Sequence, residues 1–115
     1  MAKRLNIYIA GPYTADNTEK REQNIRKARE IGRKILELGH HPYVPHTHTG
    51  KWEDASDHGY ESYMQLHLGF LEKWADALFF VGSSPGADRE KAKAEKMGMP
   101  VFTSFEEFER FAKDL

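Results

Sequence analysis

A glutamate near the start of a predicted helix is the strongest candidate for chemistry in this chain. An apolar strand pattern ends at Val81 and continues into a loop of small residues, Gly82 to Gly86, and Glu90 lies one turn inside the charged helix that follows. Free backbone N–H groups and the positive end of the helix dipole lie at such a helix start. Because this environment favours the ionised carboxylate, Glu90 could attack a carbon centre. The alternative is that Glu90 is only a charge that suits the dipole.

The composition limits the classes of function. The 115 residues predict one domain, residues 1–115, which is short for a self-contained active site, so a second subunit could complete the cleft. Lys and Arg total 17 against 18 for Asp and Glu, without long blocks of one sign, which argues against a nucleic-acid partner. The absence of cysteine excludes disulfides and a thiolate nucleophile. No apolar stretch is long enough for a signal peptide or membrane span, so we expect a cytoplasmic protein that acts on small molecules.

Apolar periodicity predicts alternating strands and helices around this glutamate. The predicted strands are residues 4–10, 41–45, 76–81 and 100–102, and the predicted helices are 25–38, 60–75, 87–97 and a terminal helix that begins at a capping box at Ser104. Gly39 and Gly98 stand where helix C-cap glycines belong. Two prolines place the second strand at a sheet edge. The segment from His46 to Gly59 has no periodicity and is predicted to be a long functional loop.

This alternation of strands and helices predicts an α/β fold and the position of a ligand. We expect a flavodoxin/Rossmann-like three-layer sandwich, with a parallel sheet of about four strands in the order 2-1-3-4 and helices on both faces. In that topology a ligand binds in the crevice at the carboxyl ends of strands one and three. The loop from Gly11 to Thr14 and the loop from Gly82 to Gly86 would meet there. Both loops would therefore lie next to Glu90. The expected position of the ligand crevice thus points to the same glutamate as the helix-start argument does.

Three short motifs resemble those of a known enzyme superfamily. They are Ile7-Tyr8-Ile9-Ala10-Gly11-Pro12-Tyr13, Val44-Pro45-His46 and Ser84-Pro85-Gly86-Ala87-Asp88-Arg89-Glu90. The chain is similar to the nucleoside 2-deoxyribosyltransferase superfamily, and most of all to its small uncharacterised branch related to the 2'-deoxynucleoside 5'-phosphate N-hydrolases. The resemblance implies cleavage or transfer at an N-glycosidic bond through a glycosyl-enzyme intermediate on Glu90, without a cofactor. It also implies that Tyr8 orients Glu90 and that Ser84 contacts the 5' end of the sugar.

Further residues are expected to face the substrate. Around the crevice these are Gly11, Pro12, Tyr13, His46 and the backbone of Gly86. Tyr60 and Tyr63, at the start of the predicted helix 60–75, could stack on a base. Thr14 stands where nucleotide-hydrolysing relatives carry a basic residue, so the choice between a nucleoside and its 5'-monophosphate stays open.

The chain departs from the superfamily at the acid–base partner. Leu68 occupies the place of a catalytic aspartate eight residues ahead of Asp76, and Asp76 itself is expected to cap or end the preceding helix. His67 is adjacent and could protonate a leaving base, although one residue of offset turns a side chain by about 100° around a helix. Glu61 and Asp57 are the next candidates. The missing aspartate also supports an alternative, a non-catalytic nucleotide-binding or sensor protein.

Two further features bear on metals and on self-association. The chain is rich in possible metal ligands, namely His40, His41, His46, His48, Asp54, Asp57 and His58, but their spacing fits no standard signature, so we predict no metal. The helix from Tyr60 to Trp74 carries more bulky aromatic residues than one sheet face can cover. We therefore expect a homodimer or larger homo-oligomer that uses this helix and closes the His46 to Gly59 loop over the neighbouring site.

Overall fold

A parallel sheet forms the centre of the fold. The structure, a computed structural model, describes residues 4–12, 18–45 and 60–114. In these parts the strands are β1 (Asn6–Ala10), β2 (His41–Tyr43), β3 (Ala77–Phe80) and β4 (Val101–Phe102). All strand pairs are parallel and the order is β2-β1-β3-β4, so the predicted sheet and strand order are confirmed.

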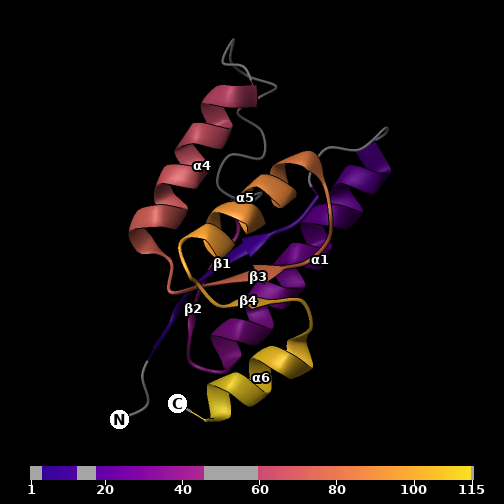
Figure 1. Cartoon of the computed structure of the whole chain (residues 1–115). Helices are drawn as coiled ribbons and strands as arrows, with labels where there is room; N and C mark the ends of the chain where they lie inside the picture. Colours follow the sequence, from indigo (N-terminus) through magenta and orange to yellow (C-terminus); the bar gives the residue numbers. More distant parts are fainter. Residues whose placement is uncertain (1–3, 13–17, 46–59, 115) are drawn as a thin grey trace.

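Helices cover both faces of this sheet, as the three-layer prediction requires. The helices are α1 (Thr18–Glu37), α4 (Tyr60–Trp74), α5 (Pro85–Lys96) and α6 (Phe105–Lys113). The purple α1 and the yellow α6 pack on one face, and the pink α4 and orange α5 on the other (Figure 1). Successive side chains of a strand point to opposite faces. Ile7 and Ile9 of β1 therefore join the core under α1 and α6, and Tyr8 and Ala10 join the core under α4 and α5.

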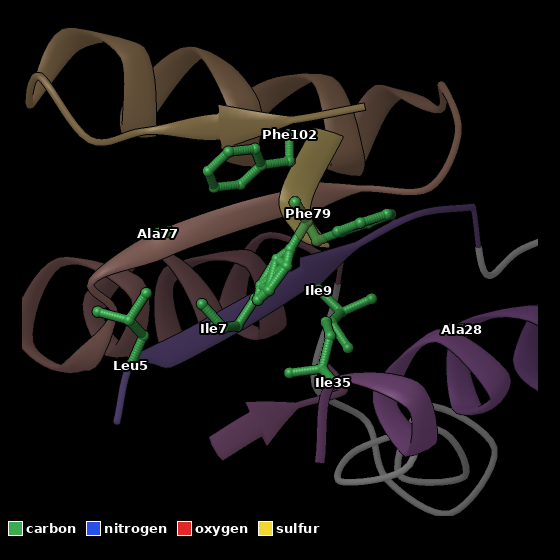
Figure 2. Close-up of a cluster of buried hydrophobic side chains, with 9 residues drawn as sticks. Leu5, Ile7, Ile9, Ala28, Ile35, Ala77, Phe79 and Phe102 are labelled. Carbon is green, nitrogen blue, oxygen red and sulfur yellow. The ribbon is translucent and has the colours of Figure 1, made fainter. Parts of the chain in front are cut away.

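The face under α1 and α6 is filled by apolar side chains. Figure 2 shows this cluster, whose buried members are Leu5, Ile7, Ile9, Ala28, Ile35, Ala77, Phe79, Phe102 and Phe108. Phe108 of α6 is fully buried, and its ring meets that of Phe102 edge-on at 5.4 Å between centroids. Phe105 and Phe111 pack against the same cluster. The hydroxyl group of Ser104 accepts the Glu107 N–H (3.2 Å), which is half of the predicted capping box.

The ends of the elements follow from local chemistry. Gly39 and Gly98 have φ angles of 90° and 75° and stand just after α1 and α5, as predicted from the C-cap preference for glycine. β2 lies at the edge of the sheet, which suits its proline. Helix α5 begins at Pro85, two residues earlier than predicted, because Ser84 caps it and proline suits the first helical position.

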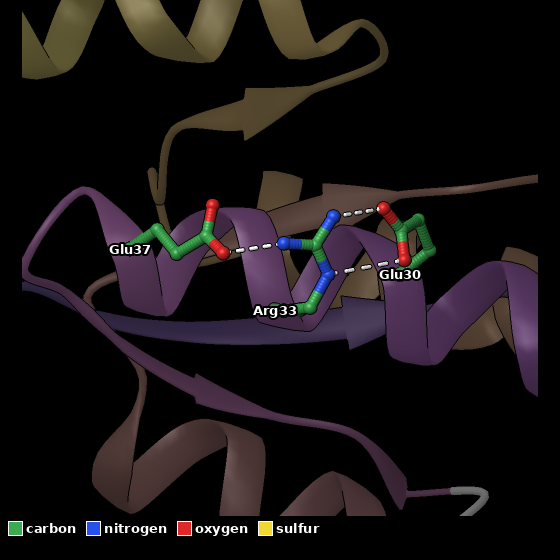
Figure 3. Close-up of polar contacts among 3 residues, drawn as sticks. All are labelled: Glu30, Arg33 and Glu37. Atoms are coloured by element: carbon green, nitrogen blue, oxygen red, sulfur yellow. Dashed lines mark hydrogen bonds and ion pairs between the residues drawn. The ribbon is translucent and has the colours of Figure 1, made fainter.

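The outer face of α1 carries an exposed ionic group. Arg33 lies between Glu30 and Glu37 and bonds to both carboxylates (Figure 3). The hydrogen bond to Glu30 raises the pKa of Arg33 above its ordinary value. Pairs this exposed contribute little to stability because water screens them and ordering long side chains costs entropy. The attachment of α1 to the sheet therefore depends on its buried face.

Asp76 and His40 both bind the backbone near the start of β1, and the helix-end role predicted for Asp76 is wrong. The carboxylate of Asp76 accepts the backbone N–H of Asn6 (2.8 Å), and the Asp76 N–H donates to the Asn6 carbonyl (2.7 Å). Asp76 thus ties β3 to β1 instead of capping the helix before it. His40, one of the possible metal ligands in the sequence, is buried and its Nδ1 accepts the Leu5 N–H (3.1 Å). Burial lowers the pKa of His40, so a neutral ring fits this place.

Candidate active site

A buried tyrosine and a buried glutamate meet on the α4/α5 face of the sheet. Tyr8 lies in the middle of β1 and is fully buried, and Glu90 of α5 is 6% exposed. The phenolic O–H of Tyr8 donates a hydrogen bond to Oε2 of Glu90. The two residues are 82 positions apart, and the fold brings them together because β1 and α5 are neighbours in space. This is the pair that the resemblance implies.

Burial governs the protonation of this pair. It raises the pKa of Glu90 to about 7, against the opposing effect of the Tyr8 hydrogen bond. The expectation that the helix start keeps Glu90 ionised is therefore wrong in sign. The helix dipole acts mainly within the first turn, and Glu90 lies beyond it in an apolar layer. The pKa of Tyr8 is raised by burial and by the charge of Glu90, so its hydroxyl stays protonated and remains a donor.

A carboxyl group with a pKa near 7 is present in both protonation states at neutral pH. Its ionised form can act as a nucleophile or general base, and its neutral form as a general acid. The hydrogen bond from Tyr8 to one of its oxygens restricts the rotation of the carboxyl group. The arrangement therefore suits chemistry in which a carboxylate reacts without free rotation.

The loops after β1 and β3 lie against each other, as the topology predicts. The Val81 N–H donates to the Ala10 carbonyl (2.7 Å) just beyond the paired residues of the two strands. A Cβ added to Gly11 would lie 3.0 Å from the Cβ of Val81, so glycine permits this approach. Beside it, a Cβ on Gly82 would meet the Pro12 ring at 3.2 Å. Gly11 and Pro12 thus lie at the carboxyl ends of β1 and β3, where the crevice is predicted.

The start of α5 uses its small residues for capping. The Ser84 hydroxyl oxygen accepts the Ala87 N–H (3.1 Å), and the Ser83 hydroxyl donates to the Asp88 carboxylate (2.9 Å). Gly86, predicted in the loop, is the second residue of the helix. That Ser84 and the Gly86 backbone also contact a substrate stays a prediction.

Tyr43 is a residue of this site that the sequence analysis missed. It stands opposite Tyr8 in the β1–β2 register, and the two ring centroids are 5.6 Å apart. Its ring also lies 4.2 Å from that of Phe70 of α4. Burial and the charge of Glu90 raise the pKa of Tyr43. The sequence does place a tyrosine on the strand expected beside β1, which could have suggested Tyr43 as a site residue. The sequence does not predict the register that places it next to Tyr8.

The proposed acid–base residues lie on α4. His67 is buried, one turn from both Met64 and Leu71, on the face of α4 that packs into the molecule. Leu68 packs into the apolar cluster that includes Leu71 and Ala87. The position of the superfamily aspartate therefore has apolar surroundings here. Other candidates fall outside the described side chains, namely Tyr13, Thr14, His46, Asp57, Tyr60, Glu61 and Tyr63.

A protein-family model matches most of the chain. A model described as "Domain of unknown function (DUF7768)" matches residues 5–104, from the start of β1 to the cap of α6. The chain belongs to this family. No curated protein sequence matches this DUF7768 protein.

A solved structure has the same fold as this DUF7768 chain. It is a 2-deoxyribosyltransferase from the psychrotolerant bacterium Bacillus psychrosaccharolyticus, described as a biocatalyst for the synthesis of nucleosides. The TM-score is 0.58 at 23% sequence identity, over 84% of this chain and 69% of that chain. This likeness agrees with the α/β architecture predicted from the sequence.

The described residues were also compared with what a metal site and a membrane-spanning helix require. Within the described residues, no three His, Asp or Glu side chains group as metal ligands, whereas His46, His48, Asp54, Asp57 and His58 lie outside them. None of the described helices is long and apolar enough to cross a membrane.

Proposed function

We propose that this protein cleaves or transfers the N-glycosidic bond of a nucleoside or nucleoside 5'-monophosphate through a glycosyl-enzyme intermediate on Glu90. The observation that carries the proposal is the buried Glu90 carboxyl group, which accepts a hydrogen bond from the Tyr8 hydroxyl and whose pKa burial raises to about 7. The fold shared with a 2-deoxyribosyltransferase and the meeting of the β1 and β3 loops support it.

In the first step the ionised Glu90 attacks the anomeric carbon of the sugar. A bond forms between a carboxylate oxygen and that carbon, the C–N bond breaks, and its electron pair leaves with the base. Tyr8 holds Oε2 and lowers the pKa of Glu90, which keeps part of the carboxyl group reactive at neutral pH. Water or a second base then attacks the anomeric carbon, the ester C–O bond breaks, and its electron pair restores the Glu90 carboxylate. The proton that the attacking group loses returns to the group that protonated the leaving base.

The departing base needs a proton, and we propose His67 as its source in place of the missing aspartate. An imidazolium can protonate a leaving base near neutral pH. His67→Ala should then slow the release of poor leaving groups far more than that of activated ones. Equal effects on both would reduce His67 to a packing residue, and Glu61 and Asp57 would be tested next.

The test of the function is direct. The protein is incubated with a panel of nucleosides and 5'-monophosphates, and free base is sought by chromatography, with and without a second base as acceptor. Base release from one substrate class supports the proposal and identifies the sugar and the acceptor. Binding of a panel member without any base release would contradict it.

That second outcome corresponds to the alternative function, a non-catalytic nucleotide-binding or sensor protein. The packing of Leu68 among apolar side chains favours this alternative, because no carboxylate stands at the acid–base position. Calorimetric binding of a 5'-monophosphate that survives unchanged through a long incubation would establish it.

We also propose that the protein is a symmetric homodimer or larger homo-oligomer that uses α4. Leu66 on this helix is 44% exposed, which supports an outward apolar contact. Light scattering at micromolar concentration tests the assembly, and a monomer would contradict it.

A further inference from the structure

A buried histidine at the amino end of the sheet takes no part in the proposed reaction. His40 is 5% exposed and stands between α1 and β2. Its Nδ1 accepts the backbone N–H of Leu5, just before β1, at 3.1 Å. The next residue continues this contact, because the His41 N–H donates to the Leu5 carbonyl at 2.8 Å. Both polar groups of the Leu5 backbone are thus bound to the segment that follows α1.

His40 also contacts the helices on this face of the sheet. Its backbone N–H donates to the Ile35 carbonyl in the last turns of α1 at 3.2 Å. Its ring meets that of Phe108 of α6 edge-on, with 5.7 Å between the centroids. Leu5, Ile35 and Phe108 all belong to the apolar cluster under α1 and α6 (Figure 2). His40 therefore lies where the start of β1, the end of α1 and α6 meet.

The hydrogen bond to Leu5 determines the protonation state of the His40 ring. A backbone N–H can only donate, so Nδ1 offers a lone pair and the proton of the neutral ring lies on Nε2. The same bond occupies Nδ1, which is thereby withheld from a metal ion. A proton on Nδ1 would place two donors against each other and would bury a charge among apolar side chains. Protonation of His40 therefore favours a conformation in which the contact with Leu5 is open.

Charged groups of the surrounding elements stay at the surface around His40. Those nearest in the chain are exposed or partly exposed, namely Arg4, Lys34, Glu37, His41 and Asp76. Helix α6 turns its phenylalanines to the cluster and its charged residues away from it. The strands β3 and β4 contain no charged residue. Burial lowers the pKa of His40 below its ordinary value of 6.5, and the charge of His41 adds to this effect.

We propose that His40 is a proton-sensitive latch, which holds the start of β1 to the end of α1 and to α6 while its ring is neutral and releases it on protonation. The latch lies at the amino ends of the strands, opposite to the crevice, and needs no substrate, so it does not depend on the proposed function. Its stabilising effect is complete above about pH 6.5 and is lost as the pH falls below this value.

Hydrogen exchange of the Leu5 amide tests the latch directly. The protection factor of this amide is measured between pH 7.5 and pH 5, and the nitrogen chemical shifts of the His40 ring show which nitrogen carries a proton. The Leu78 amide, whose acceptor is the Pro100 carbonyl at 2.9 Å, is the internal reference. We expect the protection of Leu5 to fall at least about threefold relative to that of Leu78, because proton binding favours the open form.

His40→Asn separates the hydrogen bond from the titration. The asparagine side-chain oxygen can take the place of Nδ1 as acceptor, and it does not titrate. The protection of Leu5 in this variant should be the same at pH 7.5 and pH 5. His41→Asn is the matched control, since it removes the exposed neighbouring histidine and should retain the fall seen in the wild type.

A fall at Leu5 alone, absent in His40→Asn, supports the latch. A level protection factor at Leu5 in the wild type would overturn the proposal, and so would a proton on Nδ1 at pH 7.5. An equal fall at Leu78, or a fall that persists in His40→Asn, would show general acid destabilisation and would overturn it as well. If His40→Asn does not fold, the comparison of Leu5 with Leu78 in the wild type decides.

Discussion

The two faces of the central sheet differ in what they bury. Under α1 and α6 the core consists of aliphatic and phenyl side chains, and its buried polar neighbour His40 accepts a backbone N–H while burial lowers its pKa. Under α4 and α5 the same layer contains Tyr8, Glu90 and His67. Strand β1 supplies both, because Ile7 and Ile9 point one way and Tyr8 the other. One face is thus filled by apolar side chains, whereas the other accepts the unfavourable burial of a carboxyl group.

The largest effect that tests this contrast is on turnover. Glu90→Gln should reduce base release by at least about a thousandfold, because a neutral amide cannot form the glycosyl ester. The amide side chain of this variant retains an oxygen for the Tyr8 hydroxyl, so the fold and ligand binding should persist. Single-turnover base release measures the loss, and calorimetry measures binding. Unchanged turnover would remove Glu90 from the chemistry.

On the opposite face the large effect should be on stability. Phe108 is fully buried, so Phe108→Ala should lower the free energy of unfolding by about 3–5 kcal/mol through lost burial and a cavity. The turnover of the molecules that remain folded should not change. Denaturant unfolding measures the loss, with Leu36→Ala as control, since Leu36 is 59% exposed and should change stability by less than about 0.5 kcal/mol. A reduced turnover per folded molecule would show that the faces are not independent.

The third effect is a gain in the free energy of unfolding, whereas mutations of buried residues usually lower it. The pKa of Glu90 is 4.5 ordinarily and about 7 in the fold, so folding favours its protonated form. This contribution is complete below pH 4.5 and is lost as the pH rises through 7. Glu90→Gln should therefore raise the free energy of unfolding at pH 8 by about 3 kcal/mol, and change it little at about pH 4.5.

Unfolding of both proteins at the two pH values measures this gain. The titration of His40 occurs in both proteins and cancels in the difference. Equal stability changes at about pH 4.5 and pH 8 would show that burial does not raise the pKa of Glu90.

The smallest effect concerns the contact between the two crevice loops. Gly11→Ala places a methyl group against the branched Val81 side chain and should cost about 1–3 kcal/mol. Gly69→Ala is the matched control, because among the described residues the rest of the fold has no atom within 4 Å of the added Cβ, and helix propensity predicts a gain of up to about 1 kcal/mol. Thermal unfolding compares them. A neutral Gly11→Ala would mean that the loops can separate without cost.

The sequence predicts the fold well because its signals are local. Strand–helix alternation gives the parallel order, and Gly39 and Ser104 mark helix ends through their own backbone and side-chain chemistry. What it misses depends on distant pairs. Asp76 binds the backbone of Asn6, 70 residues away, and Tyr43 meets Tyr8 only through a register that no local pattern encodes.

The sequence likewise predicts one property of the candidate site and misses another. The pairing of Tyr8 with Glu90 was anticipated through motifs, and the structure contains that contact. The protonation of Glu90 was not anticipated, because the helix position suggests an anion and only the packed α4/α5 layer reveals the desolvation that opposes it.

The edge strand β2 has a consequence for how copies of this chain can associate. An exposed edge of a sheet invites another strand to pair with it, and such pairing leads to fibres or to continuous intermolecular sheets. β2 is three residues long and contains Pro42, which has no N–H to donate, and Pro45 follows soon after. This edge is therefore a poor template for strand addition. Copies of this chain should therefore not associate by adding a strand to β2.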